Sequence, residues 1–205
     1  DKKVDYSLVV SKINTKTNYD PYTHTEDTDM NMKNSILVNK YYHLASDYAP
    51  DDIVEMSNWY SYPGNRIREE VYNAFIEMFN AAKEDGITLI VNSSYRTHDE
   101  QEAIYNDYES SQGKAYADKY AARPDYSEHQ TGLALDIFTP DAGMANFEET
   151  DAFRWLQENS YKYGFILRYP EGKEDITGYN YEAWHYRFLG KDCLLYTSPS
   201  PRDST

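Results

Sequence analysis

The sequence has little cysteine, no long apolar run and few positive charges. Its single cysteine among 205 residues excludes a disulfide within the chain. No apolar stretch approaches the ~18 residues that a membrane-spanning helix needs. Aspartate and glutamate outnumber lysine and arginine by 35 to 20, so the formal net charge is −15. This charge argues against a nucleic-acid partner, because phosphates attract lysine and arginine.

The rest of the composition is typical of one folded domain. Apolar residues make up 40% of the chain and charged residues 27%, as in globular proteins of this length. The 22 tyrosines suit either a sugar-stacking surface or packing at the edge of a core, and packing is the simpler interpretation. The chain opens on DKKVDYS, which is no signal peptide, so we expect any targeting segment to be missing from this sequence.

The N-terminal region, residues 1–35, is predicted to be a polar extension. Its one apolar patch, Leu8-Val9-Val10, predicts a short strand, and the turn-forming residues after it predict a long loop. The stretch SILVNKYYHL (35–44) predicts a second strand, and APDDIVEM (49–56) predicts a loop.

Helical signals begin at Arg66. Apolar residues then recur at spacings of four and three until just before Gly86, as on one face of a helix. Thr97 and Glu100 form a capping box, so the next helix is predicted to begin at about His98. Arg96 would then lie on the turn between the strand ITLIV (87–91) and this helix.

Helices are also predicted over residues 113–124 and 151–164, and strands over 165–170 and 181–189. Helices and strands are therefore mixed without βαβ regularity. This order favours an α+β fold with a small, mostly antiparallel sheet.

The stretch SEHQTGLALDI (127–137) carries polar residues at the start of a strand. Its apolar residues alternate with Ala134 and Asp136, which is the period-two pattern of a strand. Gly132 ends any helix before it, so His129 is expected in a loop that enters the strand. Asp136 is expected to project from the face opposite to the leucines. A carboxylate so close to core residues is costly unless it is paired or bound to a metal.

The chain has five histidines, and two of them lie near carboxylates. His129, Asp136 and His185 together would supply two nitrogens and one oxygen and leave a fourth position open, as in catalytic zinc sites. The simpler interpretation is that the histidines are hydrogen-bonded or at the surface and that Asp136 pairs with an arginine such as Arg96 or Arg168. The other histidines, His24, His43 and His98, are expected to be exposed.

Glu182 and Arg96 could complete a hydrolytic site. Glu182 would take a proton from the attacking water and pass it to the leaving amine. Arg96 would stabilise an oxyanion or bind a substrate carboxylate. In a regular strand Glu182 and His185 point to opposite faces, so we expect Glu182 to lie in a turn or next to a bulge. Gly178 and Asn180 make that turn plausible.

These motifs resemble those of the VanY-type D-alanyl-D-alanine carboxypeptidases. Two stretches match the family's patterns directly: SEHQTGLALDI matches S-x-H-x-x-G-x-A-x-D, and EAWH (182–185) matches E-x-W-H. Three further stretches resemble the family, namely SSYR with Gln101, GFILRYP and YYHLASDYAPDDIV. The resemblance covers about residues 36–192. It implies a small antiparallel sheet flanked by helices, as in the related hedgehog domains. One departure is Ala183, where many relatives have proline.

Carried over residue by residue, the resemblance implies roles for seven side chains. One zinc ion would be held by His129, Asp136 and His185. Glu182 would be the general base, and Arg96 would act near the scissile carbonyl. Ser127 and Gln101 match positions near the substrate.

The implied function is removal of the terminal D-alanine from peptidoglycan stem peptides, outside the cytoplasmic membrane, by a monomer. An L,D-carboxypeptidase acting on the tetrapeptide stem and a phage-lysin-like endopeptidase remain alternatives. So do a non-catalytic, zinc-containing wall-binding domain and a metal-free wall-binding module. Because a purely structural zinc site needs neither Glu182 nor Arg96, catalysis is favoured.

The last thirteen residues, 193–205, share no pattern with those before them. The stretch from Cys193 to Asp203 reads CLLYTSPSPRD, which resembles the translation of a transposase-type sequencing adapter. We therefore expect a non-native tail after the catalytic domain (36–192), in place of the native C-terminus.

Overall fold

The computed structural model describes residues 6–192, which form two compact units. Each unit is assembled from three stretches of the chain that alternate along the sequence. The first unit contains residues 6–49, 96–131 and 169–182, and the second contains residues 50–95, 132–168 and 183–192.

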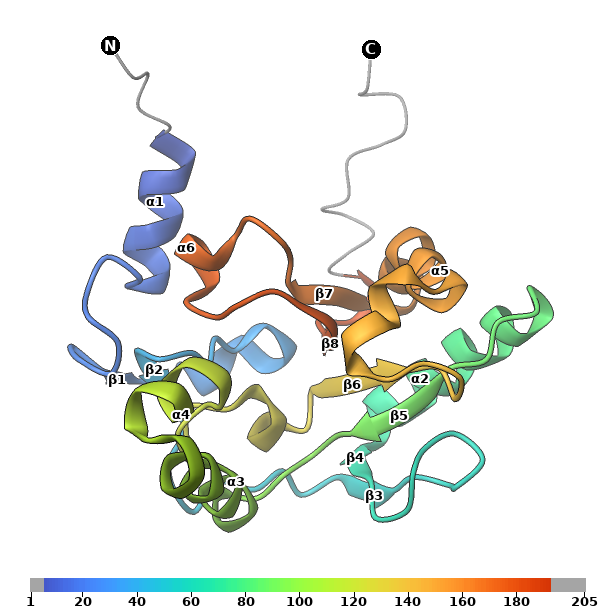
Figure 1. Cartoon of the computed structure of the whole chain (residues 1–205), viewed down its shortest axis with the longest axis horizontal. Coiled ribbons are helices and arrows are strands. Elements are labelled where there is room, and N and C mark those ends of the chain that lie inside the picture. Colours follow the sequence, from blue (N-terminus) through green and yellow to red (C-terminus); the bar gives the residue numbers. More distant parts are fainter. Residues whose placement is uncertain (1–5, 193–205) are drawn as a thin grey trace. The chain divides into compact units, whose positions relative to one another are not determined.

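The second unit is organised around a four-stranded sheet with the order β5-β6-β8-β7 (Figure 1). Its strands are β5 (Ile90–Ser93), β6 (Ala134–Phe138), β7 (Phe165–Tyr169) and β8 (Glu182–Phe188). Strand β6 is antiparallel to both β5 and β8. A separate antiparallel pair is formed by β3 (Ile53–Glu55) and β4 (Arg66–Arg68). The short 3-10 helix η3 (Met144–Glu149) follows β6.

Two helices of the second unit follow the periodicity of the sequence. Helix α2 (Glu69–Glu84) buries its apolar stripe and ends before Gly86, whose φ is +79°. Helix α5 (Asp151–Asn159) begins at a Thr150 cap and continues into the 3-10 helix η4 (Ser160–Tyr163). The indole Nε1 of Trp155 donates to Asp85 Oδ2 at 2.7 Å, which ties α5 to the end of α2.

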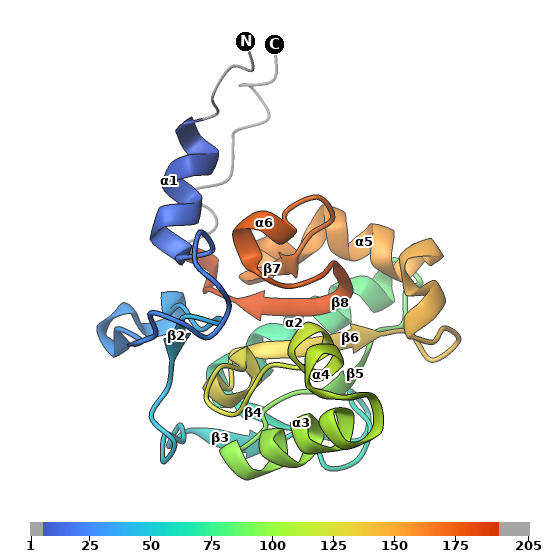
Figure 2. The same cartoon turned by 60° about the vertical axis from the view of Figure 1, so that its left-hand side comes forward.

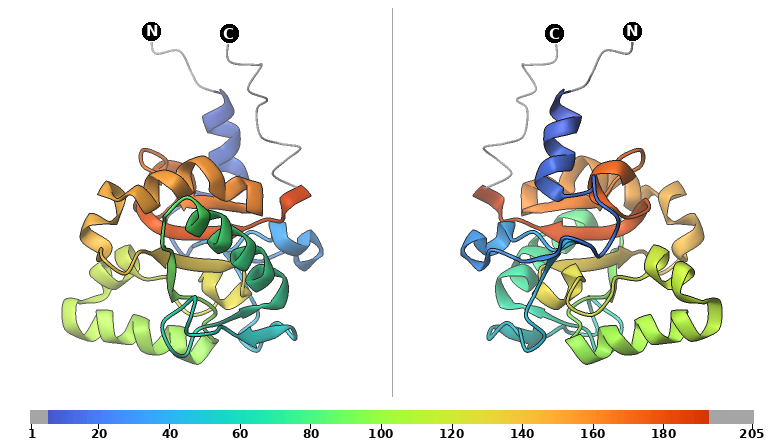
Figure 3. Two further views of the ribbon diagram at one scale, coloured as in Figure 1. Left: turned by 90° about the vertical axis from the view of Figure 1, so that its right-hand side faces the viewer. Right: turned by 90° about the vertical axis from the view of Figure 1, so that its left-hand side faces the viewer.

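The first unit is mainly helical. Its elements are α1 (Tyr6–Thr15), β1 (Glu26–Asp27), η1 (Met30–Ser35), β2 (Tyr42–His43), α3 (His98–Gln112), α4 (Lys114–Tyr120), η2 (Glu128–Thr131) and α6 (Glu174–Thr177). Helix α1 lies beside α6 (Figure 2), where Lys12 Nζ is 2.7 Å from Asp175 Oδ2. Helices α3 and α4 are neighbours (Figure 3) that bury Tyr105, Ala117 and Ala121.

The mixed fold with small, mostly antiparallel sheets confirms the predicted class. The capping box is also confirmed: Thr97 Oγ1 accepts from Glu100 N, and the Glu100 carboxylate accepts from Thr97 N, so α3 begins at His98. Local side-chain chemistry therefore sets this helix start.

Four local predictions in the N-terminal half were wrong. Residues 66–68, predicted to begin a helix, form strand β4, and helix α2 begins only at Glu69. Residues 8–10 lie in helix α1, because a helix satisfies its backbone hydrogen bonds without a neighbouring strand. In the predicted strand 35–44 only β2 is extended, since the Asn39 side chain accepts from the backbone of both Tyr41 and Tyr42 and turns the chain. The predicted loop 49–56 contains strand β3.

Among the described residues, no helix has the length and apolar character to cross a membrane. The predicted non-native tail, 193–205, lies outside the described residues. The predicted division at residues 35 and 36 stays a prediction.

Candidate active site

Strands β6 and β8 place Asp136 and His185 directly opposite each other. The imidazole Nδ1 of His185 lies 3.3 Å from Asp136 Oδ1. His185 is buried and Asp136 is half-buried. Opposed residues of an antiparallel pair project from the same face of a sheet, so the register brings these two polar groups together.

The local sequence accounts for the orientation of Asp136. Its neighbours Leu135 and Ile137 are completely buried, as predicted for the core face of the strand, but Ala134 and Phe138 are buried as well, so exposure does not alternate along β6 and only Asp136 is half-buried. The turn into β6 requires Gly132, whose φ is +66°. A Cβ at this position would lie 2.7 Å from Arg68 Cγ, so the turn has no space for a side chain.

The separation of Asp136 and His185 fits two ligands of one metal ion. Zinc–nitrogen and zinc–oxygen bonds of ~2.0–2.2 Å set the ligand atoms of a tetrahedral site about 3.3–3.6 Å apart. The observed 3.3 Å falls in this range. In the first unit, by contrast, His98 Nδ1 lies 2.7 Å from Asp125 Oδ1, a hydrogen-bond distance. His129, Asp136 and His185 are the candidate metal ligands of the described chain.

His129 lies in the first unit, on the short helix η2, and is buried together with the other three residues of that helix. Its backbone N–H donates to Ser127 Oγ at 3.3 Å, and its carbonyl accepts from Arg96 N at 3.2 Å. Arg96 lies between β5 and α3, which confirms its predicted place on the turn. The structure therefore brings three of the predicted residues, Arg96, Ser127 and His129, to one place.

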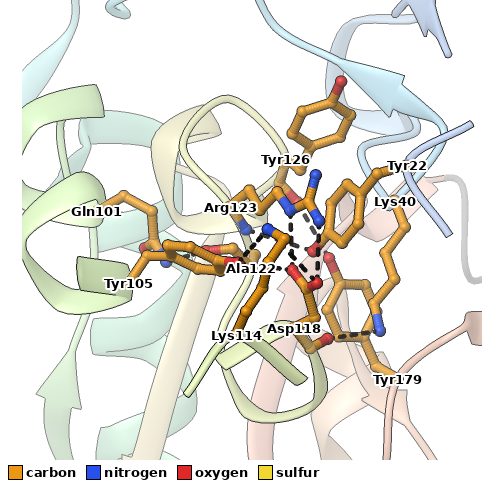
Figure 4. Close-up of polar contacts among 10 residues, drawn as sticks. All are labelled: Tyr22, Lys40, Gln101, Tyr105, Lys114, Asp118, Ala122, Arg123, Tyr126 and Tyr179. Carbon is orange, nitrogen blue, oxygen red and sulfur yellow. Dashed lines mark hydrogen bonds and ion pairs between the residues drawn. The ribbon is translucent and has the colours of Figure 1, made fainter. Parts of the chain in front are cut away.

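A cluster of polar side chains, here called the Asp118 cluster, anchors the chain ahead of Ser127 (Figure 4). Asp118 accepts from Arg123 Nε at 2.8 Å, from Arg123 Nη2 at 2.9 Å and from the Tyr105 hydroxyl at 2.7 Å. The Arg123 guanidinium also stacks on Tyr22, with its Cζ 3.8 Å from the ring centroid. Although burial raises the pKa of Asp118, hydrogen bonds from Arg123 and Tyr105 outweigh burial and hold this pKa below its usual value.

Lys40 and Tyr179 extend the Asp118 cluster toward other segments of the first unit (Figure 4). Lys40 Nζ donates to the Asp118 carbonyl at 3.0 Å and lies 4.7 Å from the centre of the Tyr179 ring. Burial lowers the pKa of Lys40 and raises the pKa of Tyr179. The Tyr179 hydroxyl donates to the Tyr126 carbonyl at 3.3 Å. This bond links the segment before Ser127 to the segment before Glu182.

Glu182 is the first residue of β8 and is half-buried. The prediction that Glu182 lies in a turn or next to a bulge was wrong, because the turn at the end of α6 comes earlier, at Gly178 with a φ of +75°, and the chain is extended again by Glu182. Exposure alternates over the first four residues of β8, where Ala183 and His185 are buried and Glu182 and Trp184 are half-buried, and the rest of the strand is buried. Trp184 stacks on Phe138 with the ring centroids 6.0 Å apart. The role of Glu182 stays a prediction.

Gln101 is buried on α3 and donates from Nε2 to the Ala122 carbonyl at 2.7 Å. This bond braces α3 against the segment after α4, and the predicted role near a substrate stays a prediction. Of the three remaining histidines only His24 is exposed, whereas His43 and His98 are half-buried. That part of the prediction was wrong because His98 pairs with Asp125, which is 27 residues away.

The sequence also gave no reason to single out Asp118 and Arg123. Their five-residue spacing is not a motif, and Tyr22, which covers Arg123, lies 101 residues earlier in the chain. Both residues lie in the helix predicted over residues 113–124, which carries charges of both signs, and the sequence shows nothing else that would point to them.

Comparisons with known proteins agree with this geometry. The family model described as VanY, D-alanyl-D-alanine carboxypeptidase, matches residues 64–191. YodJ of Bacillus subtilis is 44% identical over 176 residues, which are 80% of this chain and 63% of that protein. A D-alanyl-D-alanine carboxypeptidase of Enterococcus faecalis is 38% identical over 177 residues, 82% of this chain and 63% of the relative. The chain thus spans less than two thirds of the length of these relatives.

Solved structures show the same fold. The LdcB LD-carboxypeptidase superposes with a TM-score of 0.78 at 39% identity, covering 85% of each chain. VanYB in complex with D-alanine-D-alanine gives a TM-score of 0.66 at 36% identity, covering 78% of this chain and 88% of the other. A VanY D,D-pentapeptidase variant in complex with Zn(II) gives 0.67 at 37% identity, covering 78% and 90%. Together with the match over residues 64–191, these similarities show that the chain belongs to the VanY D-alanyl-D-alanine carboxypeptidase family.

Proposed function

We propose that this protein is a zinc-dependent D,D-carboxypeptidase that removes the terminal D-alanine from peptidoglycan stem peptides. The observation that carries the proposal is the pair of opposed ligand atoms on Asp136 and His185, 3.3 Å apart, in a chain of this family. The complex of the related VanYB with D-alanine-D-alanine supports the substrate class.

One zinc ion would be held by His129, Asp136 and His185. Two neutral imidazoles and one carboxylate are typical zinc ligands and leave a position open. The Zn(II) complex of a VanY variant supports this choice of metal. When bound, zinc makes water a stronger nucleophile near neutral pH and polarises the scissile carbonyl.

Glu182 would act as the general base, taking a proton from the attacking water and passing it to the amine of the departing D-alanine. Arg96 offers a planar guanidinium that suits the substrate's terminal carboxylate or the oxyanion. The hydrogen bond between Arg96 N and the His129 carbonyl supports a fixed place for this arginine beside a metal ligand. Ser127 and Gln101 are proposed to line the substrate site.

An L,D-carboxypeptidase that acts on the tetrapeptide stem is a second candidate. It is favoured by the LdcB LD-carboxypeptidase, whose TM-score of 0.78 and identity of 39% exceed the values for VanYB. A non-catalytic zinc domain would need neither Glu182 nor Arg96, so the presence of both supports an enzyme. Either activity places the protein outside the cytoplasmic membrane, where peptidoglycan lies, and we propose that it acts there as a monomer.

Product analysis by mass spectrometry tests the proposal. Zinc-loaded protein is incubated with a pentapeptide stem ending in D-Ala-D-Ala and, separately, with the corresponding tetrapeptide, each with an EDTA control. We expect the pentapeptide to lose one alanine and EDTA to prevent the loss. Cleavage of the tetrapeptide alone would establish the L,D activity. Cleavage of neither by folded, zinc-loaded protein would overturn both carboxypeptidase assignments.

A further inference from the structure

Three tyrosines of α3 and α4, here called the tyrosine surface, hold their rings in solvent. Tyr108, Tyr116 and Tyr120 are 38%, 39% and 48% exposed. The ring centroids of Tyr108 and Tyr116 are 6.0 Å apart with an interplanar angle of 25°, and those of Tyr116 and Tyr120 are 4.4 Å apart. The three rings therefore form one continuous aromatic strip.

The tyrosine surface lies outside the buried contact between α3 and α4. Tyr105, Ala117 and Ala121 form the buried contact between these helices. The Tyr105 hydroxyl is also engaged by Asp118. The outward rings keep apolar area in water, and contact with a binding partner would remove it. Tyrosine suits such a surface because a rigid apolar ring carries a polar hydroxyl at its tip.

We propose that the tyrosine surface binds the glycan strand of peptidoglycan, in an extension that rests on the proposed function. The apolar C–H faces of sugar rings pack on aromatic faces, whose partial negative charge attracts them. The sugar hydroxyls can meanwhile bond to the tyrosine hydroxyls. The net charge of −15 disfavours polyanions and so favours an uncharged polysaccharide. Lys119 Nζ lies 5.1 Å from the centre of the Tyr120 ring and adds a hydrogen-bond donor beside the strip.

The length of a stem peptide matches the position of this surface. Tyr108 follows His98, the first residue of α3, by ten residues, so it lies about 15 Å along the helix axis at 1.5 Å per residue. Arg96, the proposed carboxylate-binding residue, lies two residues before His98, with the Thr97 cap between them. An extended five-residue stem spans at most ~17–18 Å. A stem whose C-terminus reaches Arg96 can thus remain attached to a glycan strand on the tyrosine surface.

The test compares the wild type with a Tyr116→Ala/Tyr120→Ala double variant, and with a Tyr62→Ala/Tyr161→Ala control that removes two exposed tyrosines of the second unit. The probe is a soluble chitin oligosaccharide, an uncharged β-1,4-linked N-acetylglucosamine chain that carries no stem peptide, titrated by calorimetry. We expect the double variant to lose roughly tenfold or more in affinity. It should release D-alanine more slowly from intact sacculi, at an unchanged rate on free pentapeptide.

Two further variants keep the test decisive. Tyr120→Ala alone changes one exposed ring if the double variant fails to fold, and Tyr120→Trp should retain binding because it keeps an aromatic face. Wild-type protein that does not bind the chitin oligosaccharide, or a double variant that binds it as the wild type does, would overturn the proposal. Because glycan binding is measured without hydrolysis, a protein that binds the oligosaccharide but cleaves no pentapeptide would refute the proposed function alone.

Discussion

His185 Nδ1 lies 3.3 Å from Asp136 Oδ1, and the two residues are paired in the register of β8 and β6. Because both strands belong to the central sheet of one unit, backbone hydrogen bonds fix this separation before any ion binds. A preorganised pair of ligand atoms reduces the cost of ordering them around a metal. From this relationship we derive the first prediction.

Asp136→Asn should lower zinc affinity by at least about 100-fold, because a neutral amide replaces the only anionic ligand proposed. Chelator competition measures the affinity. The thermal stabilisation by excess zinc, which approaches ~2.7 kcal/mol at a concentration 100 times Kd, should disappear with it. Asp141→Asn, at an exposed position of the same unit, is the control. Equal zinc affinity in Asp136→Asn and the wild type would exclude Asp136 as a ligand.

Gly132→Ala should destabilise the protein by about 2–4 kcal/mol, because strain at positive φ is added to a contact of 2.7 Å with Arg68 Cγ. Gly86→Ala is the matched control. Gly86 also has a positive φ, +79°, but nothing lies within 4 Å of an added Cβ, so its cost should be about 1 kcal/mol. Urea unfolding of both variants measures the difference. Equal losses would show that the turn into β6 has room for a side chain.

The pair of His98 and Asp125 should make stability depend on pH. The hydrogen bond to Asp125 raises the pKa of His98 above its ordinary value. A raised folded-state pKa means that the stabilisation is fully present below the unfolded-state value of ~6.5 and is lost as pH rises through the folded-state value. His98→Gln should therefore cost about 0.5–1 kcal/mol at pH 5.5 and less at pH 9. A cost that grows with pH would contradict this assignment.

Asp118→Asn should destabilise the protein by about 1–3 kcal/mol at pH 7, because it weakens two charge-assisted bonds from Arg123 and leaves this half-buried cation unneutralised. The pKa of Asp118 is held below its usual value. Its contribution is thus present above the unfolded-state pKa of ~3.9 and is lost as pH falls through the lower folded-state value. Urea midpoints of variant and wild type should converge in acid. A constant difference down to pH 2 would argue against the ion pair as the cause.

How far the sequence predicted this structure depends on how local each signal is. Thr97 and Glu100 bond to each other's backbone, so their capping box could be recognised from four residues. The alternation around Asp136 likewise needed only the strand itself. In contrast, the turn at Asn39 depends on which backbone groups its side chain captures, and the α1 residues Val9 and Val10 read equally well as a strand.

The residues of the candidate site also differ in how local their sequence signals are. His129, Asp136, His185 and Glu182 were identified because two short motifs carry them. The Asp118 cluster could not be, since Tyr22, Lys40 and Tyr179 come from three distant stretches of the chain that meet only in the folded unit. Such long-range contacts leave no periodic pattern in the sequence.

The most direct test of the central claim compares zinc content and D-alanine release in the wild type and in Glu182→Gln. The account predicts one zinc per chain in both proteins. It also predicts that the variant releases D-alanine from the pentapeptide at least 100-fold more slowly, since a general base contributes ~10²–10⁴ to the rate. A variant that binds zinc and cleaves at the wild-type rate, or a wild type that cleaves without zinc, would contradict the account.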